Sequence, residues 1–268
     1  MSNDKAAGAG TNAPRFVWYD LMTTDEGGAK AFYSKVLGWG TQAWEGSSQP
    51  YTMWTVKSTP IGGLMRLPPE AASAGAPPHW LGYVGCKDVD ASTKQAEKLG
   101  GKLLHPPMDI PEVGRFSVLA DPQGAVFALF TPKAGSSMES PAPGTPGNVS
   151  WAELNTTDWE GAWKFYAALC DWKPTTAMDM EGLGTYFMFT HRDGGDKSMG
   201  GMSNAATMMK APAHWMFYVD VADIDKTLAI VKESGGKVLN GPMDVPGNGK
   251  IAQCMDPQGA FFAVYYQG

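Results

Sequence analysis

Two pairs of ionisable residues, one pair in each half of the chain, are of types that can do acid–base or metal chemistry. The first pair is Asp20 with His79, and the second is Glu153 with His214. A carboxylate beside an imidazole fixes the ring tautomer and raises its pKa, which suits a general base. The same two groups are also ligands of a weak metal site. The alternative is a buried ion pair or hydrogen bond that only stabilises the sheet.

Aromatic residues accompany both pairs at strand spacing. Trp18 lies two residues before Asp20, so alternation along a strand puts both side chains on one face. Tyr83 lies four residues after His79 and shares its face by the same rule. The sequence therefore predicts an aromatic surface for a flat or apolar ligand, with ordinary core packing as the alternative. The complete predicted ligand-binding set is Trp18, Asp20, His79, Tyr83, Trp151, Glu153, His214 and Tyr218. No catalytic residue is assigned.

The residues that position these side chains belong to one unit that occurs twice. Similar segments include FVWYDLMTTD (16–25) and VSWAELNTTD (149–158), HWLGYV (79–84) and HWMFYV (214–219), and DPQGAVFALF (121–130) and DPQGAFFAVY (256–265). Self-similarity over such lengths indicates a duplicated domain. We predict domains at 15–133 and 149–268, a linker at 134–148 rich in Pro, Gly and Ser, and a disordered tail at 1–14.

Each predicted domain is itself divided into two similar modules. A strand at 16–24 precedes a helix that Asp25 caps and Gly38 ends, and strands follow at 51–57 and 60–67 with a Thr-Pro turn between them. The order then repeats, with a strand at 79–86, a helix at 87–101 and strands at 102–105, 114–120 and 125–131. The predicted fold class is α+β, with tandem βαβββ modules, four in the chain and two per domain. They form two cup-shaped mixed sheets.

Composition narrows the class of protein. The apolar content of 43% and charged content of 18% are typical of a globular chain. A net charge of −6 argues against a nucleic-acid partner, and no apolar run is long enough for a membrane span. Cys86, Cys170 and Cys254 align with aliphatic residues of the other copy, which predicts buried thiols. Three cysteines without CxxC spacing make a poor disulfide framework, which predicts a reducing, cytoplasmic compartment. A homo-oligomer is compatible with these features.

The segments TTDEGGAKAFYSKVLGW, DVDASTKQAEKLGG and DPQGAVFALF, with their second-half counterparts, resemble the vicinal oxygen chelate superfamily. That superfamily includes glyoxalase I, bleomycin-resistance proteins and extradiol dioxygenases. Within it, the chain looks like the tandem two-domain bacterial glyoxalase-like proteins. The resemblance covers nearly the whole chain outside the tail and linker. It implies a concave site for a small molecule and, in the active members, a divalent metal there.

The resemblance also implies where metal ligands would lie, and this chain departs from that pattern. The first-strand position falls on Trp18 and Trp151, and the eighth-strand position on Ala128 and Ala263. The fourth strand lacks the expected carboxylate. On the fifth strand, His79 and His214 are assigned to the ligand position. One matched position in four is fewer than the three protein ligands that a catalytic metal normally needs.

Three functions remain open at this point. The first is a binding protein for a small apolar or aromatic molecule, without a cofactor. The second is a metal-dependent lyase of glyoxalase type or a dioxygenase with an altered site, for which Asp20, His79, Glu153 and His214 are the metal candidates. The third is an interaction protein that uses its repeated halves for assembly. Before the seventh strand, Arg115 or Lys250 can hold an anionic group or be a solvated edge.

Overall fold

The structure is a computed structural model, and it describes residues 14–45, 51–136, 138–182 and 184–268. The first half contains β1 (Phe16–Thr23), α1 (Glu26–Leu37), β2 (Gly40–Ala43), β3 (Thr52–Val56), β4 (Thr59–Arg66), α2 (Pro69–Ser73), β5 (His79–Gly85), α3 (Val89–Lys98), β6 (Lys102–Ile110), β7 (Gly114–Ala120) and β8 (Val126–Pro132). The tail expected at 1–14 lies outside the described residues except for Pro14, whose carbonyl accepts a hydrogen bond from Trp172.

The second half repeats this order of elements. It contains β9 (Val149–Asn155), α4 (Trp159–Cys170), β10 (Lys173–Met180), β11 (Gly184–Thr190), β12 (Gly200–Ser203), α5 (Ala205–Met209), β13 (His214–Asp220), α6 (Ile224–Glu233), β14 (Lys237–Val245), β15 (Gly249–Met255) and β16 (Phe261–Tyr266). The four-module prediction is confirmed. Two elements of each half were not predicted: the strand after the first helix, which is β2 or β10, and the one-turn helix α2 or α5.

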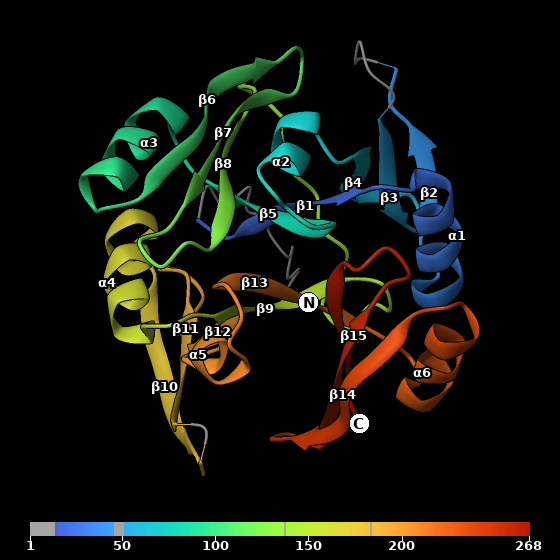
Figure 1. Cartoon of the computed structure of the whole chain (residues 1–268). Coiled ribbons are helices and arrows are strands. Elements are labelled where there is room, and N and C mark those ends of the chain that lie inside the picture. The colour runs from blue at the N-terminus through green and yellow to red at the C-terminus, as the bar shows by residue number, and fades with distance from the viewer. Residues whose placement is uncertain (1–13, 46–50, 137, 183) are drawn as a thin grey trace, which may run out of the picture.

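Each half forms one eight-stranded mixed sheet. The strand orders are β2-β3-β4-β1-β5-β8-β7-β6 and β10-β11-β12-β9-β13-β16-β15-β14. The first strands of the two modules in each half, β1 with β5 and β9 with β13, pair antiparallel at the sheet centre. In Figure 1 the outer strands of the first sheet curl toward the top of the picture, and those of the second sheet curl toward the bottom. This confirms two cup-shaped sheets. We call the concave face of the first sheet the first cup and that of the second sheet the second cup.

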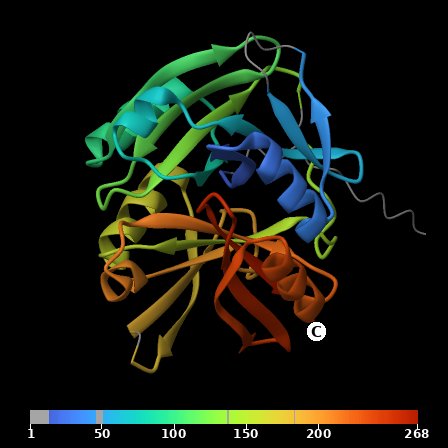
Figure 2. The ribbon, with the colours of Figure 1, turned by 45° about the vertical axis from the view of Figure 1, so that its right-hand side comes forward.

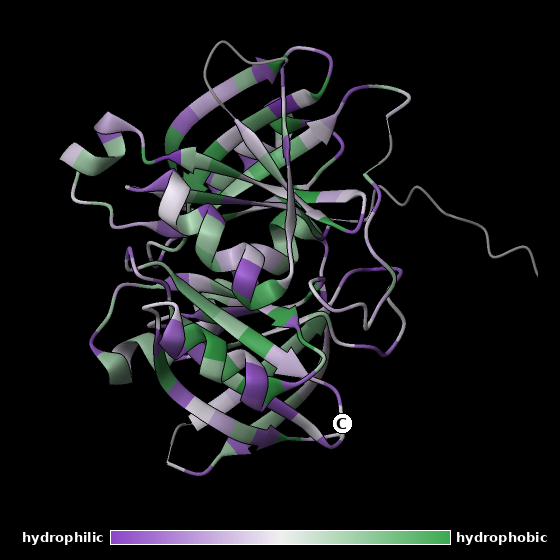
Figure 3. Cartoon of the chain, turned by 90° about the vertical axis from the view of Figure 1, so that its right-hand side faces the viewer, coloured by the Kyte–Doolittle hydropathy of each residue, from purple (hydrophilic) through white to green (hydrophobic). Residues whose placement is uncertain are grey.

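The convex faces of the two sheets meet in the middle of the molecule. Helix α1 packs against α6, and α3 packs against α4; both views show α1 directly above α6 (Figures 1 and 2). Tyr19, on the convex side of β1, lies 4.9 Å from the ring of Phe217 on β13. Figure 3 shows hydrophobic residues concentrated on the strands and helices in this central region. The two cups therefore open to opposite sides, and His79 and His214 cannot share one site.

The two largest core clusters each contain residues of both halves. One cluster joins Phe32 and Val36 of α1 with Leu228 and Val231 of α6. The other joins Phe127 of β8 to residues of α4 and β9. Each helix thus buries its apolar stripe between its own sheet and the other half of the chain.

The two DPQG turns, one in each half, make the same contacts, which accounts for the repeat of this motif. Asp256 accepts hydrogen bonds from the amides of its own turn through Oδ1, and its Oδ2 accepts from the Tyr33 hydroxyl of the other half over 3.1 Å. The first half mirrors this with Asp121 and Tyr166, also at 3.1 Å. Gly124, with φ of 99°, supplies the left-handed residue that the turn needs. Each turn therefore closes its own hairpin and also joins the two halves.

Local predictions are largely confirmed, with two corrections. Asp25 caps α1 by accepting from the Gly28 amide, and Gly38 ends the helix with φ of 69°. The turn before β4 lies at Lys57, with φ of 56°, instead of at Thr-Pro, and Pro60 lies inside the strand beside an irregularity in pairing. Strand β6 continues to Ile110 because Asp109 pairs with Arg115 of β7.

The repeat alignment predicts burial correctly for two of the three thiols. Cys170 and Cys254 are buried, Cys86 is half-buried, and all three are free. Burial raises the pKa of Cys254 to about 12, so at neutral pH this thiol carries no nucleophilic thiolate. Across the part of the chain that the structure describes, no helix is long and apolar enough to cross a membrane.

Candidate functional site

A buried carboxyl group lies at the centre of the first cup. Asp20 is 4% exposed. Its Oδ1 accepts from Trp18 Nε1 over 2.8 Å and from the Tyr51 hydroxyl over 2.7 Å. Its Oδ2 accepts from the Tyr83 hydroxyl over 2.8 Å. We call these four residues the Asp20 cluster. All three side-chain donors are uncharged aromatic groups, so the site is polar at its centre and apolar around it.

The second cup contains the matching arrangement, the Glu153 cluster of Trp151, Glu153, Tyr186 and Tyr218. The Tyr186 hydroxyl donates to Glu153 Oε2 over 2.9 Å and accepts from Trp151 Nε1 over 3.0 Å. Tyr218 lies close enough for the charge of Glu153 to raise the pKa of its hydroxyl, and it accepts from Gln253 over 3.3 Å. The two clusters place an indole, two phenols and an acid at equivalent positions, but Trp18 donates to the acid of its cluster whereas Trp151 donates to Tyr186.

Tyr51 and Tyr186 are the residues that sequence reasoning missed. They occupy equivalent places, since YTMWT (51–55) aligns with YFMFT (186–190). The repeat comparison therefore contained the signal, but Tyr51 lies immediately before β3 and Tyr186 lies on β11, away from the segments expected to hold ligands. Each hydroxyl reaches the acid by passing over a glycine of the neighbouring strand.

Gly63 is required for that close approach. A Cβ at this position would lie 1.9 Å from the Tyr51 hydroxyl oxygen and 2.5 Å from Asp20 Oδ1. Gly201 plays the same part in the second cup, where a Cβ would lie 2.4 Å from the Tyr186 ring. On β4, where the resemblance implies a carboxylate ligand, this chain has Gly63, and the Tyr51 hydroxyl occupies the space above it.

Replacing Gly63 by alanine is expected to displace Tyr51 and to lower the free energy of unfolding by about 1–3 kcal/mol, the usual range for an overpacked site. Gly27→Ala is the matched control, because its Cβ would meet Asp25 Oδ1 at an ordinary 3.6 Å. Urea unfolding of both variants measures the difference. If Gly63→Ala is no less stable than Gly27→Ala, the packing described here is incorrect.

The strand register corrects the position assigned to the histidines. Trp18 is paired with Tyr83, and Tyr83 in turn with Ala128. The row in which the resemblance places metal ligands therefore crosses β5 at Tyr83, whereas His79 lies level with Met22. The second cup has the same row of Trp151, Tyr218 and Ala263. His79 and His214 lie on the concave faces but toward the rim.

The expected acid–imidazole pairs are also corrected. Both oxygens of Asp20 are occupied by aromatic donors, and His79 Nδ1 bonds to the carbonyl of Pro77 over 2.7 Å. His214 Nδ1 likewise bonds to the Pro212 carbonyl over 2.9 Å. The backbone before each strand holds the ring at the rim, so neither histidine is positioned as a base activated by its neighbouring acid.

The residues in the ligand row do not fit a divalent metal. The indole nitrogen of Trp18 is a donor only, the Tyr83 hydroxyl already donates to Asp20, and Ala128 has no polar side-chain atom. Within residues 14–45, 51–136, 138–182 and 184–268, no group of three or more His, Cys, Asp and Glu side chains is arranged to hold a metal ion. One buried acid with three donors is a poor cation site.

Burial sets the protonation of the two acids. Desolvation raises the pKa of Asp20 above its ordinary value of 3.8, and the hydrogen bonds from Tyr51, Tyr83 and Trp18 only partly oppose it. Desolvation raises the pKa of Glu153 in the same way. Each cup therefore favours a neutral carboxyl more than water does.

The raised pKa of Asp20 predicts that the stability of the protein depends on pH. Because the folded pKa of Asp20 is raised, its stabilising contribution is complete below the unfolded pKa and is lost as pH rises through the folded one. We expect wild type to lose stability relative to Asp20→Asn as pH rises from about 4 through that range. Urea unfolding of both proteins at a series of pH values measures it. A wild-type advantage that grows with pH contradicts the raised pKa.

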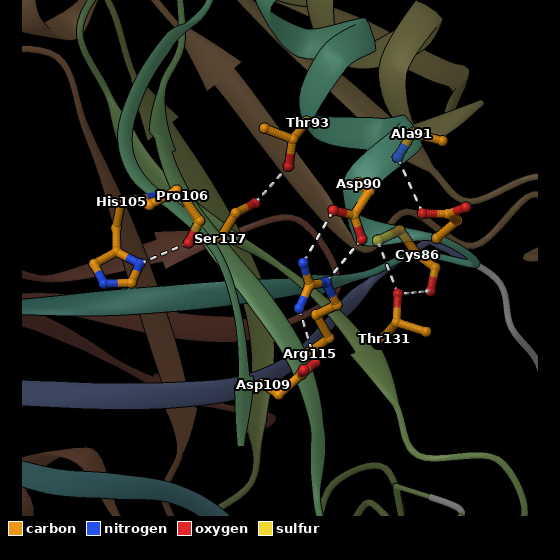
Figure 4. A network of polar contacts seen from close by, with 11 residues as sticks. Cys86, Asp90, Ala91, Thr93, His105, Pro106, Asp109, Arg115, Ser117 and Thr131 are labelled. Carbon is orange, nitrogen blue, oxygen red and sulfur yellow. Dashed lines mark hydrogen bonds and ion pairs between the residues drawn. The ribbon is translucent and has the colours of Figure 1, made fainter. Parts of the chain in front are cut away.

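Arg115 uses three of its five guanidinium N–H donors in bonds to neighbouring acids. Its guanidinium bonds to both carboxylate oxygens of Asp90, over 2.7 and 3.0 Å, and to Asp109 over 2.9 Å (Figure 4). It borders a shallow hollow of about 300 Å³, where Lys133 is paired with Glu112. The structure thus assigns Arg115 to joining α3 with the β6–β7 hairpin.

Relatives of known sequence resemble the chain over nearly its whole length. "Putative glyoxylase CFP32" of Mycobacterium tuberculosis is 33% identical over 249 residues, covering 92% of each chain. "Anthracycline biosynthesis protein DauV" of Streptomyces sp. strain C5 is 31% identical over 258 residues, covering 92% of this chain and 91% of its own.

Solved structures share the fold at low identity. The Mn(II)-bound glyoxalase from Novosphingobium aromaticivorans superposes with a TM-score of 0.62 at 18% identity, over 96% of this chain and 82% of its own. A variant of homoprotocatechuate 2,3-dioxygenase from B. fuscum gives 0.65 at 17% identity, over 95% and 72%. The sequence profile of the Glyoxalase/Bleomycin resistance protein/Dioxygenase superfamily matches residues 15–129 and 148–264. With both halves matched and relatives aligned end to end, this chain belongs to the Glyoxalase/Bleomycin resistance protein/Dioxygenase superfamily.

Proposed function

We propose that this protein binds a small, planar aromatic molecule in its cups, and that it does so without a metal. The observation that carries the proposal is the Asp20 cluster, repeated as the Glu153 cluster. In each, a half-buried indole and a half-buried phenol surround one buried carboxyl group. Each ligand row consists of an indole, which can only donate, a phenol and an alanine, and so contains neither a histidine nor a carboxylate.

The chemistry of the cluster suits such a ligand. Aromatic rings that stack or meet edge to face add about 0.5–1.5 kcal/mol beyond the area they bury. A carboxyl whose pKa is raised by burial presents less charge to an apolar molecule than an exposed acid does. The tyrosine hydroxyls give a polar edge of the ligand a partner without requiring a charged one.

The relatives' names support this reading. Anthracyclines are planar polycyclic aromatic compounds, and a protein named for their biosynthesis aligns with this chain over 92% of its length. The glyoxylase name of the mycobacterial relative favours the second hypothesis, a metal-dependent enzyme. The donor set of the cups weighs against that hypothesis here, because it offers one acid per cup.

Binding of anthraquinone-2-sulfonate, measured by calorimetry and tryptophan fluorescence, tests the proposal. Trp18→Leu and Trp151→Leu each remove one aromatic wall, and we expect each to weaken binding in its cup about tenfold. Trp159→Leu is the matched control. Trp159 stacks on Phe187 at 5.0 Å, and alternation from Tyr186 places that ring on the convex side.

Metal content is measured on the same samples. We expect binding to be unchanged by EDTA and by added Zn²⁺, Ni²⁺, Mn²⁺ or Fe²⁺. Binding that requires about one equivalent of metal per cup would replace the proposal with the metal-dependent one. Failure of this and other planar aromatic probes to bind would overturn it.

A further inference from the structure

The rim of the second cup has two buried polar atoms that lack partners. Asn155 is 2% exposed, and its Nδ2 makes no hydrogen bond within the described chain. His214 Nε2 is also buried and without a partner there. The two residues face each other across β9 and β13 in the strand register. Buried polar groups in proteins are nearly always hydrogen-bonded, so two unpaired groups on neighbouring strands indicate an absent partner.

These atoms belong to the concave face. Asn155 lies two residues after Glu153, and His214 two residues before Met216, which packs with Trp151 and Tyr218. The Asn155 amide is close enough to Glu153 to oppose the rise in the pKa of that acid, although it lies outside hydrogen-bonding geometry. The pair therefore adjoins the Glu153 cluster on the side of the rim.

An exposed aromatic ring lies beside the pair. Phe261 is 45% exposed, and its ring centre lies 6.1 Å from that of His214. It precedes Ala263 of the ligand row by two residues, so it faces the same cup. An exposed phenylalanine next to unpaired polar atoms provides an apolar platform for a ring whose edge is polar.

The hydrogen-bonding roles identify the chemistry of the missing partner. A carbonyl only accepts, so His214 Nδ1 donates its proton to Pro212, and Nε2 of the neutral ring is an acceptor. Asn155 Nδ2 is a donor. A hydroxyl group accepts from one and donates to the other, whereas a carbonyl or an ether satisfies only Asn155.

The first cup lacks this combination. In the repeat alignment, Met22 takes the place of Asn155, and Val126 takes the place of Phe261. A thioether offers no donor. The two cups therefore share a central cluster and differ at the rim.

We propose that the second cup selects a hydroxylated aromatic molecule, with its hydroxyl between Asn155 and His214 and its ring against Phe261. This inference rests on the proposed function and deepens it, since it names a ligand class for one of the two cups. A ligand hydroxyl gives both unpaired atoms a hydrogen-bond partner, so the second cup should bind molecules with this hydroxyl more tightly than those without it.

A pair of probes with nearly the same shape tests the inference. Calorimetry compares 2-naphthol with 2-methylnaphthalene on the full-length protein, and we expect 2-naphthol to bind about tenfold more tightly. Asn155→Met, which copies the first cup, should abolish that preference while leaving 2-methylnaphthalene binding unchanged. Met22→Leu is the control in the other cup and should change neither. On ¹⁵N-labelled histidine, 2-naphthol should shift one Nε2 resonance, which is absent in His214→Phe.

The outcomes separate this inference from the proposed function. Equal binding of the two probes, or an Asn155→Met variant that keeps the preference, overturns the inference and leaves aromatic binding in place. Binding of neither probe counts against the proposed function itself. Without ligand, Asn155→Met should unfold at the same or a higher urea concentration, because it removes an unpaired amide. A marked loss of stability would show that Asn155 is structural and would overturn the inference.

Discussion

The first half of the chain, produced alone as residues 14–133, is expected not to fold into a stable domain. Phe32 and Tyr33 of α1 lie 5.8 and 5.4 Å from Phe262 of the other half. Phe127 lies 5.4 Å from Tyr166. Burying one large apolar side chain is worth about 1.5–3 kcal/mol, and a whole domain is stable by only about 5–15 kcal/mol. Exposing several such rings therefore removes most of the stability.

Circular dichroism, dye binding and urea unfolding of the isolated half measure this. We expect weak cooperativity and an exposed apolar surface. Co-expression of residues 14–133 with residues 149–268 is the control and should restore one cooperative transition, because both clusters are then complete. A sharp unfolding transition for the isolated half would show that the shared core contributes little.

The second large effect on stability is expected when Asp256, which is 1% exposed, is replaced. Its Oδ1 accepts from the amides of Gln258, Gly259 and Ala260 over 2.9, 2.8 and 2.8 Å. Its Oδ2 accepts from Tyr33 of the other half. Asp256→Ala leaves these donors without their acceptor, and we expect a loss of about 3–4 kcal/mol in the free energy of unfolding.

Two variants make the comparison specific. Asp223→Ala removes a more exposed aspartate that caps α6 through the Lys226 amide, for which about 1 kcal/mol is expected. Tyr33→Phe removes only the hydrogen bond between the halves and should fall between the two. Thermal and urea unfolding provide the values. If Asp256→Ala costs no more than Asp223→Ala, the turn is not the junction described here.

Much of the fold follows from the sequence because its signals are local and occur twice. The helix that starts at Asp25, the DPQG turns and the four strand-helix modules all depend on residues close together in the chain. Alternation also places Trp18 and Asp20 on one face correctly, as their hydrogen bond shows. The domain boundaries at 15–133 and 149–268 stay a prediction.

The site was harder to predict because it depends on how separate strands align. Counting along one strand cannot show that Trp18 is level with Tyr83 instead of His79, since hydrogen bonds between strands set that register. Tyr51 reaches Asp20 only because β4 has no side chain at Gly63. The ligand-binding role of the eight predicted residues stays a prediction, as does the absence of a cofactor.

The meeting of the two convex faces has a consequence for how such a chain can diversify. Along each strand, the side chains that contact the other half lie on the convex face, and the side chains that line a cup lie on the concave face. Met22 and Asn155 occupy equivalent positions in the two halves, and a change there alters one cup without affecting the contact between the halves. A duplicated gene with this architecture can acquire two chemical preferences on a single scaffold, provided that its central tyrosines and turn aspartates stay complementary.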